Sequence, residues 1–283
     1  MSQSSKFFFS ETFEVNEDVK RVFDENGFIL LRGVLDKEEL SKVEHTLTGS
    51  DAITKHIYLD THDGDRRTDK IMWSFPGSDV TGMVARCEKI AGTMEKLLGG
   101  EVYHYHTKLM MKDAGTGARS VWHQDYGYWY LYGNLFPDMG TVFIPLDPCR
   151  RDNSCLQVLR GSHKCGRLDH HRVIGQMGCD EDRMLQIQEQ CPLEYIEMEA
   201  GDAIFFHCNL IHSSSDNTSD KRRWAFLTAY NRASNNPAQD DPHPQYTPLH
   251  KVPNSAIKSC SNYTDMNGKR FMGPAYKTIL PKS

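Results

Sequence analysis

The sequence predicts a mainly β fold, a sandwich or barrel with helices packed outside it. From Glu101 onward the chain consists of short runs rich in β-branched and aromatic residues, separated by Gly, Asp, Asn and Pro. Before that point, apolar residues recur at helical spacing. A helical stretch followed by many short strands is typical of helices covering the outside of a β core.

The 283 residues, 39% of them apolar, suffice for one large domain. We expect a single domain over residues 1–283, with a helical N-terminal part at 12–100, a β core at 101–231 and a C-terminal wrap at 232–283. No internal repeat or low-complexity tract divides it.

In the N-terminal part, "VNEDVKRVFDENG" predicts a helix that stops at Gly27, and "FILLRGVL" predicts a strand. Asp36 and Glu39 form a capping box that opens a helix at "KEELSKVEHTL". Residues 51–79 suggest a loop with a short strand, and a second helix is expected over 80–97 before Gly99.

The β core begins after this helix. Residues 160–190 are too polar and irregular for core strands and are expected to form a long insertion. The expected strands are "VYHYHTKLMM", "SVWHQDYGYWY", "TVFIPLD", "CLQVLRG", "LEYIEMEAGD", "AIFFHCNLIH" and "WAFLTAY".

Charge, cysteine usage and the length of the apolar runs limit the partners and the cellular location of the protein. The net charge of −5 and the lack of a basic block longer than "KRR" at 221–223 exclude nucleic acid. The eight cysteines form no CxxC pair, and no apolar run is long enough for a signal peptide or a membrane span. We therefore expect a reducing, cytoplasmic location without membrane association.

The stretch "WHQDYGYWY" at 122–130 places His123 and Asp125 two residues apart. On a strand such residues share a face, so an imidazole nitrogen and a carboxylate could bind one metal ion. In a chain with thirteen histidines this spacing also arises by chance, and a surface ion pair is the competing interpretation.

A second stretch, 201–226, is interpreted as a strand, a polar turn and a returning strand. A hairpin centred on Asn217 and Thr218 would place His212 opposite Arg223, with Ser214 on the same face. On such a face an arginine either binds an anion or is a solvated cation at a strand end. Two histidines and a carboxylate form the facial triad of non-heme iron oxygenases, whose open positions accept a 2-oxo acid and dioxygen.

The stretches "VWHQD", "DNSCLQVLRGSHK", "EAGDAIFFH" and "IHSSSDNTSDKRR" resemble, in order and spacing, the phytanoyl-CoA dioxygenase family, most of all its ectoine-hydroxylase-like branch. The resemblance covers about residues 20 to 231. It implies a double-stranded β-helix (a cupin-like jelly roll) that uses Fe(II), 2-oxoglutarate and O2, with ascorbate as an optional addition. It also implies that His123, Asp125 and His212 bind the iron.

By the same resemblance, Arg223 and Ser214 hold the carboxylate of 2-oxoglutarate, and Lys112 and Thr141 are cosubstrate neighbours. An edge cation and an ordinary strand threonine are the alternatives for the last two. Trp129 matches a tryptophan that packs on substrate. Tyr126, Tyr128 and His106 could complete an aromatic pocket for a small cation or zwitterion, although some of these rings are expected in the core.

The chain departs from the family pattern at a few positions. Ser154 and Arg160 replace a glycine and a proline and are interpreted as turn residues away from the metal. Asp125 is retained, which disfavours halogenation. Trp224 and Ala225 stand where ectoine enzymes have an asparagine, which disfavours ectoine itself, and no basic cluster suits the phosphates of coenzyme A.

The sequence therefore predicts a 2-oxoglutarate-dependent dioxygenase, a monomer or homodimer, that hydroxylates a C–H bond of a small molecule and releases succinate and CO2. Two alternatives stay open. One is a non-catalytic β-helix protein that binds or senses a ligand, and the other is a zinc hydrolase that uses the same triad.

Overall fold

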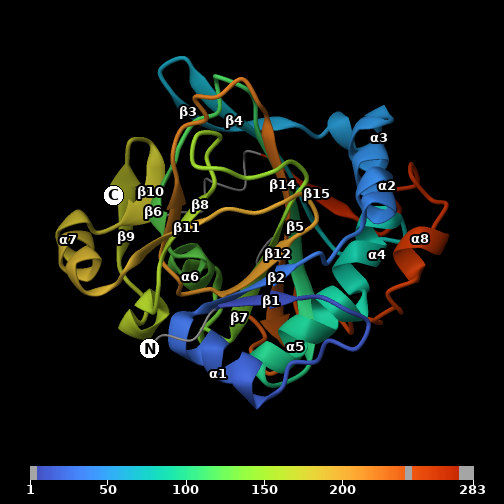
Figure 1. Ribbon diagram of the computed structural model, residues 1–283, viewed down its shortest axis with the longest axis horizontal. Helices are drawn as coiled ribbons and strands as arrows, with labels where there is room; N and C mark the ends of the chain where they lie inside the picture. Colours follow the sequence, from blue (N-terminus) through green and yellow to red (C-terminus); the bar gives the residue numbers. More distant parts are fainter. Residues whose placement is uncertain (1–4, 240–243, 274–283) are drawn as a thin grey trace.

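Two β sheets pack face to face in the computed structural model, which describes residues 5–239 and 244–273 (Figure 1). The large sheet runs in the order β1 (Lys6–Phe8), β2 (Phe28–Arg32), β12 (Ala203–His207), β7 (Met139–Pro145), β14 (Arg223–Arg232), β5 (Val102–Lys112), β4 (Arg66–Ser74) and β15 (Arg270–Met272), with β3 (Tyr58–Asp63) also paired to β4. The small sheet runs β11 (Leu193–Ile196), β8 (Leu156–Leu159), β13 (His212–Ser214) and β6 (Ser120–His123). This arrangement confirms the predicted jelly roll.

The large sheet is buried on both faces, and its side chains alternate between two cores. Phe205 packs with the helices on the outer face, whereas Phe206 packs toward the small sheet. Strands covered on both sides become continuous apolar runs, as in "FILL" at 28–31 and "AIFF" at 203–206. The helices in contact with this sheet or with one another are α1 (Glu17–Asn26), α2 (Lys37–Thr48), α3 (Asp51–Thr54), α4 (Val80–Arg86), α5 (Thr93–Leu98) and α8 (Ala256–Ser259).

Two helix signals of the N-terminal part are confirmed. Helix α1 ends at Gly27 in the left-handed conformation, with φ of 82°, and α2 begins with both hydrogen bonds of the Asp36–Glu39 capping box. Two other expectations were wrong. Residues 51–79 contain α3 and the β3–β4 hairpin, whose polar alternation belongs to a sheet edge. The helix expected over 80–97 is interrupted at Cys87, where the backbone is extended and pairs with Val252.

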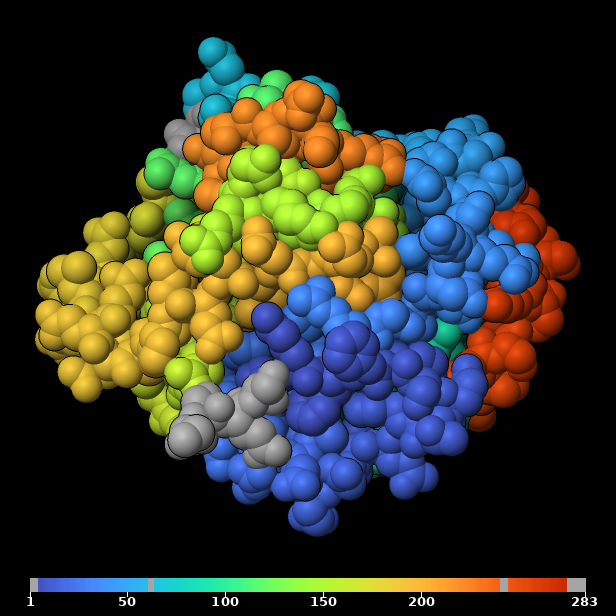
Figure 2. Space-filling model, in the orientation of Figure 1, coloured from blue at the N-terminus to red at the C-terminus, as the bar shows by residue number. Residues whose placement is uncertain are grey.

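The insertion at 160–190 joins neither main sheet, as expected, but it is not irregular. It contains a short 3-10 helix (Ser162–Cys165), a hairpin of β9 (His170–Val173) and β10 (Gln176–Cys179), and α7 (Glu181–Gln190). Figures 1 and 2 show most of this insertion at the left of the molecule, where Figure 1 labels β9, β10 and α7. Part of the expected C-terminal wrap, 240–243 and 274–283, lies outside the described residues, and β15 adds an edge strand to the large sheet.

The hairpin expected over 201–226 does not exist. Strand β13 crosses to the small sheet, whereas β12 and β14 belong to the large one. His212 is therefore paired with His123 and Val158, and Arg223 is paired with Lys112. In a jelly roll the chain passes from one sheet to the other at such polar turns. The prediction of one hairpin was wrong because it assumed that both strands stay in the same sheet.

Candidate active site

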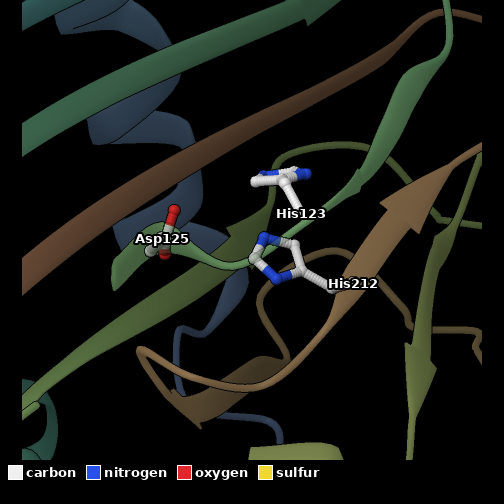
Figure 3. Close-up of side chains that lie close together, drawn as sticks. All are labelled: His123, Asp125 and His212. Atoms are coloured by element: carbon white, nitrogen blue, oxygen red, sulfur yellow. The ribbon is translucent and has the colours of Figure 1, made fainter. Parts of the chain in front are cut away.

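The three predicted metal ligands lie together at one end of the small sheet. His123 is the last residue of β6, His212 is the first of β13, and the two are direct cross-strand partners with ring centroids 4.2 Å apart. Asp125 begins α6 (Asp125–Trp129), so it does not share a strand face with His123 as expected. One ligand atom from each residue lies within 4.8 Å of the others, and Figure 3 shows the three side chains gathered in one place.

Backbone carbonyls fix the orientation of both imidazoles. Nδ1 of His123 lies 2.7 Å from the carbonyl of Val121, and Nδ1 of His212 lies 2.9 Å from the carbonyl of Leu210. A ring that donates from Nδ1 presents Nε2 as a lone pair, which is the usual arrangement of a metal-binding histidine. The donor set of two such nitrogens and a carboxylate oxygen fits a divalent transition metal.

The surroundings hold each ligand in the protonation state that metal binding needs. Burial lowers the pKa of His123 well below its usual range, and the neighbouring His212 lowers it further. Burial also lowers the pKa of His212. Burial opposes ionisation of Asp125, but Lys108, the two histidines and a hydroxyl outweigh it and keep the pKa of this carboxyl below its ordinary value. Neutral imidazoles and an ionised carboxylate result.

Thr141 supplies that hydroxyl. It lies on β7 of the large sheet and donates to Oδ2 of Asp125 at 2.7 Å. The sequence resemblance implies that Thr141 neighbours the cosubstrate, and in the structure it bonds directly to the carboxylate of the predicted metal triad. On the other side of the carboxylate, Nζ of Lys108 lies 3.9 Å from Oδ1.

Two cationic side chains are buried on neighbouring strands of the large sheet. Arg223 and Lys112 are cross-strand partners on β14 and β5, with 3% and 0% of their surface exposed. Nη2 of Arg223 contacts Oγ of Ser154 at 3.3 Å, whereas its Nε has no hydrogen bond. A buried guanidinium that is left unsatisfied is costly, so this side chain is suited to an incoming carboxylate.

Lys112 is satisfied by the protein itself. Its Nζ donates to Oγ of Ser154 at 2.8 Å, to Oγ of Ser214 at 2.7 Å and to the carbonyl of Ser215 at 3.1 Å. An ammonium has three protons, so all of them are used. Ser214 thus contacts the lysine of this cationic pair. Burial, and then the charge of Arg223, lower the pKa of Lys112 well below its ordinary value.

A cavity of about 210 Å³ opens beside the ligands, with His123 and Asp125 in its wall. Trp129 and His106 line it as predicted, and their rings lie 5.6 Å apart. Tyr126 does not line it, although its ring belongs to the same aromatic core cluster as Trp129, and its hydroxyl donates to the carbonyl of Asn134. The other lining residues are Tyr58, Asp60, Lys70, Met72, Lys108, Met110, Ser120, Tyr128, Tyr132, Arg172, Gly175, Gln176 and Met177.

Sequence reasoning missed three kinds of residue at this site. Lys108 lies on the same face of β5 as His106 and Lys112, and strand alternation alone could have identified it. Lys70 lies on the β3–β4 hairpin and Arg172 lies in the insertion. Both line the cavity, and no signal in the sequence predicts that these two segments reach it. From the sequence, Ser154 is interpreted as a turn residue away from the metal, yet its hydroxyl contacts both Lys112 and Arg223.

The insertion is also joined to the backbone between the two ligands. The amide N–H of Gln124 donates to Nε2 of His170 at 2.9 Å, and the side chain of Gln124 bonds to Gly166, Leu168 and Asn209. Burial lowers the pKa of His170 to about 4, which keeps Nε2 available as an acceptor. His170 therefore links the insertion to the segment that carries His123 and Asp125.

A jelly roll with two histidines and one carboxylate on one side, and a buried arginine on the large sheet, is typical of non-heme iron oxygenases that use a 2-oxo acid. Comparison with known proteins identifies the family. The family model described as phytanoyl-CoA dioxygenase (PhyH) matches residues 23–225. The chain belongs to the phytanoyl-CoA dioxygenase family and is an oxidoreductase, which confirms the resemblance read from its motifs.

Curated relatives and solved structures agree with this assignment. An L-proline trans-4-hydroxylase of Streptomyces griseoviridis is 29% identical over 252 residues, which cover 82% of this chain and 91% of the relative. An ectoine dioxygenase of Bordetella bronchiseptica is 26% identical over 264 residues, covering 87% and 84%. The structure of EctD from S. alaskensis with bound Fe shares the fold, with a TM-score of 0.72 at 21% identity and coverage of 87% and 91%.

In the described residues, no helix has the length and apolar character needed to cross a bilayer.

Proposed function

We propose that this protein hydroxylates a C–H bond of a small zwitterion or amino acid that carries a carboxylate. The observation that carries the proposal is the cavity beside the triad, which combines aromatic walls with the cationic side chains of Lys108 and Arg172. Its volume of about 210 Å³ is below the roughly 300–1,000 Å³ of pockets for drug-sized ligands. A molecule of amino-acid size suits it.

The charges in the cavity wall favour an anionic group on the substrate. Lys70 forms an ion pair with Asp60 at 2.7 Å, so these two charges offset each other. Asp125 is committed to the metal. Lys108 and Arg172 are then available to a substrate carboxylate, while the rings of Trp129 and its aromatic neighbours suit the apolar or cationic part of the molecule. Proline and ectoine, named in the relatives, are small carboxylates of this kind.

The residues divide the work between them. His123, Asp125 and His212 would hold the iron, and Arg223 would bind the distal carboxylate of 2-oxoglutarate. Trp129, His106 and Tyr128 wall the cavity, position the substrate and exclude water. With iron and 2-oxoglutarate bound, the site would place one oxygen atom of O2 on the substrate, and the cosubstrate would leave as succinate and CO2.

A screen for substrate-stimulated succinate release tests the proposal. The protein would be reconstituted with Fe(II) and supplied with 2-oxoglutarate, O2 and a panel of amino acids, betaines and cyclic amino acids, with Asp125→Ala as the control. We expect one or more members to raise succinate formation in the wild type alone. Binding of the panel without succinate would favour the sensing protein, and hydrolysis that depends on zinc would favour the hydrolase.

A further inference from the structure

Ser154 has a backbone conformation that serine rarely adopts. Its φ is 77°, in the left-handed region that favours glycine, and its side chain is fully buried in the loop between β7 and β8. Asn153 fastens this loop, because its Oδ1 accepts from the amide of Arg150 at 2.7 Å and its Nδ2 donates to the carbonyl of Pro148 at 2.7 Å. Glycine would suit the backbone better, so the hydroxyl needs an explanation of its own.

The hydroxyl of Ser154 uses its full hydrogen-bonding capacity. Its oxygen accepts from Nζ of Lys112 at 2.8 Å and from Nη2 of Arg223 at 3.3 Å, and its proton is donated to the carbonyl of Ser215. A hydroxyl offers one proton and two lone pairs. Because the carbonyl fixes the proton, both lone pairs point at the two cations.

The two cations need such a bridge. Lys112 and Arg223 are directly opposite each other on neighbouring strands and are both buried, where like charges repel strongly. An oxygen between them offsets part of this repulsion and keeps their heads together. Lys112 has no proton left to donate, whereas Nε of Arg223 has no partner. The guanidinium is therefore the direct ligand, and the ammonium contributes charge at short range.

We propose that Ser154 is a positioning residue for 2-oxoglutarate: its hydroxyl ties Arg223 to Lys112 and aims the guanidinium at the distal carboxylate. This inference rests on the proposed use of 2-oxoglutarate. It requires that the affinity for the cosubstrate depend on the hydroxyl and be independent of the backbone strain at residue 154.

Two substitutions separate the hydroxyl from the strain. Ser154→Ala removes the hydroxyl and keeps a side chain in the left-handed conformation, whereas Ser154→Gly removes the hydroxyl and relieves the strain. Anaerobic calorimetry would titrate 2-oxoglutarate onto Fe(II)-loaded protein, with Fe(II) binding measured separately. Ser74→Ala, at a fully buried serine of β4 that contacts Met272, is the matched control.

We expect both variants to bind 2-oxoglutarate about tenfold more weakly than the wild type, with Fe(II) affinity unchanged and with Ser154→Gly melting at a higher temperature than Ser154→Ala. Ser74→Ala should bind the cosubstrate normally. Normal binding by both Ser154 variants, or by the glycine variant alone, would overturn the proposal, because the second pattern assigns the effect to strain. A wild type that binds no 2-oxoglutarate would overturn the proposed function together with this inference.

Discussion

Replacing Thr141 by valine removes one hydrogen bond from the Asp125 carboxylate and leaves a side chain of nearly the same shape. The bond is 2.7 Å long, and its two residues are 1% and 3% exposed, so water does not replace the lost donor. We expect Thr141→Val to fold normally and to bind iron more weakly, because the carboxylate loses the contact that fixes its orientation.

The magnitude follows from the charge on the acceptor. A buried hydrogen bond to a charged group contributes about 1.5–3 kcal/mol, and about 1.4 kcal/mol corresponds to a factor of ten. Iron affinity should therefore fall by about 10- to 100-fold. The same bond helps to lower the pKa of Asp125, so the loss should be larger below neutral pH, where the proton competes with the metal.

Anaerobic titration of Fe(II) onto the apoprotein measures the effect, and the Michaelis constant for 2-oxoglutarate is then determined at saturating iron. Thr228→Val is the matched control, because Thr228 is fully buried on the neighbouring strand β14 and contacts Thr107. An unchanged iron affinity with a raised Michaelis constant for 2-oxoglutarate would refute this reasoning and return Thr141 to the cosubstrate role that its family position implies.

Three further perturbations probe other parts of the site. Arg223→Ala should weaken 2-oxoglutarate binding by about 2–5 kcal/mol and spare iron, and calorimetry that shows equal losses for both ligands would contradict the assignment. Trp129→Ala should lose about 1–3 kcal/mol of substrate binding and uncouple the reaction, so that succinate forms with little hydroxylated product; iron loss in proportion to activity would make Trp129 a core residue. His170 has a pKa of about 4 in the folded chain and about 6.5 unfolded, so the unfolded state binds its proton first. The free energy of unfolding should be insensitive to this group above about pH 6.5 and fall by about 3 kcal/mol as the pH drops toward 4. Denaturant titrations should show a flatter profile for His170→Gln over that window.

The grouping of His123, Asp125 and His212 could be predicted because the motifs around them resemble those of a known family, although the His123–Asp125 spacing alone also arises by chance. The reasons given for their proximity were partly wrong. Asp125 meets His123 through the start of a helix, and His212 meets it through strand pairing in the small sheet. The residue types and motifs therefore predicted the grouping correctly, whereas the strand geometry assumed for it was wrong.

Other features depend on contacts between distant segments. Arg223 faces Lys112 because β14 pairs with β5, and strand alternation within 201–226 contains no information about that pairing. The role of Ser154 depends on where a loop between β7 and β8 meets β5 and β14, which a single sequence does not specify. Tyr126 and Trp129 look alike in the sequence and belong to one aromatic core cluster, and only their packing shows that Trp129 also lines the cavity whereas Tyr126 does not.

The two halves of this site are mounted on different sheets. The histidine ligands extend from β6 and β13, whereas Thr141, Lys112 and Arg223 extend from the large sheet. Under the proposed function, the spacing between the sheets sets the distance between the metal and the carboxylate of 2-oxoglutarate. Substitutions in the apolar layer between the sheets would change that distance. The insertion reaches the substrate cavity through Arg172 and its neighbours without entering that layer. Substitutions in the insertion can therefore change substrate preference without changing the spacing between the two sheets.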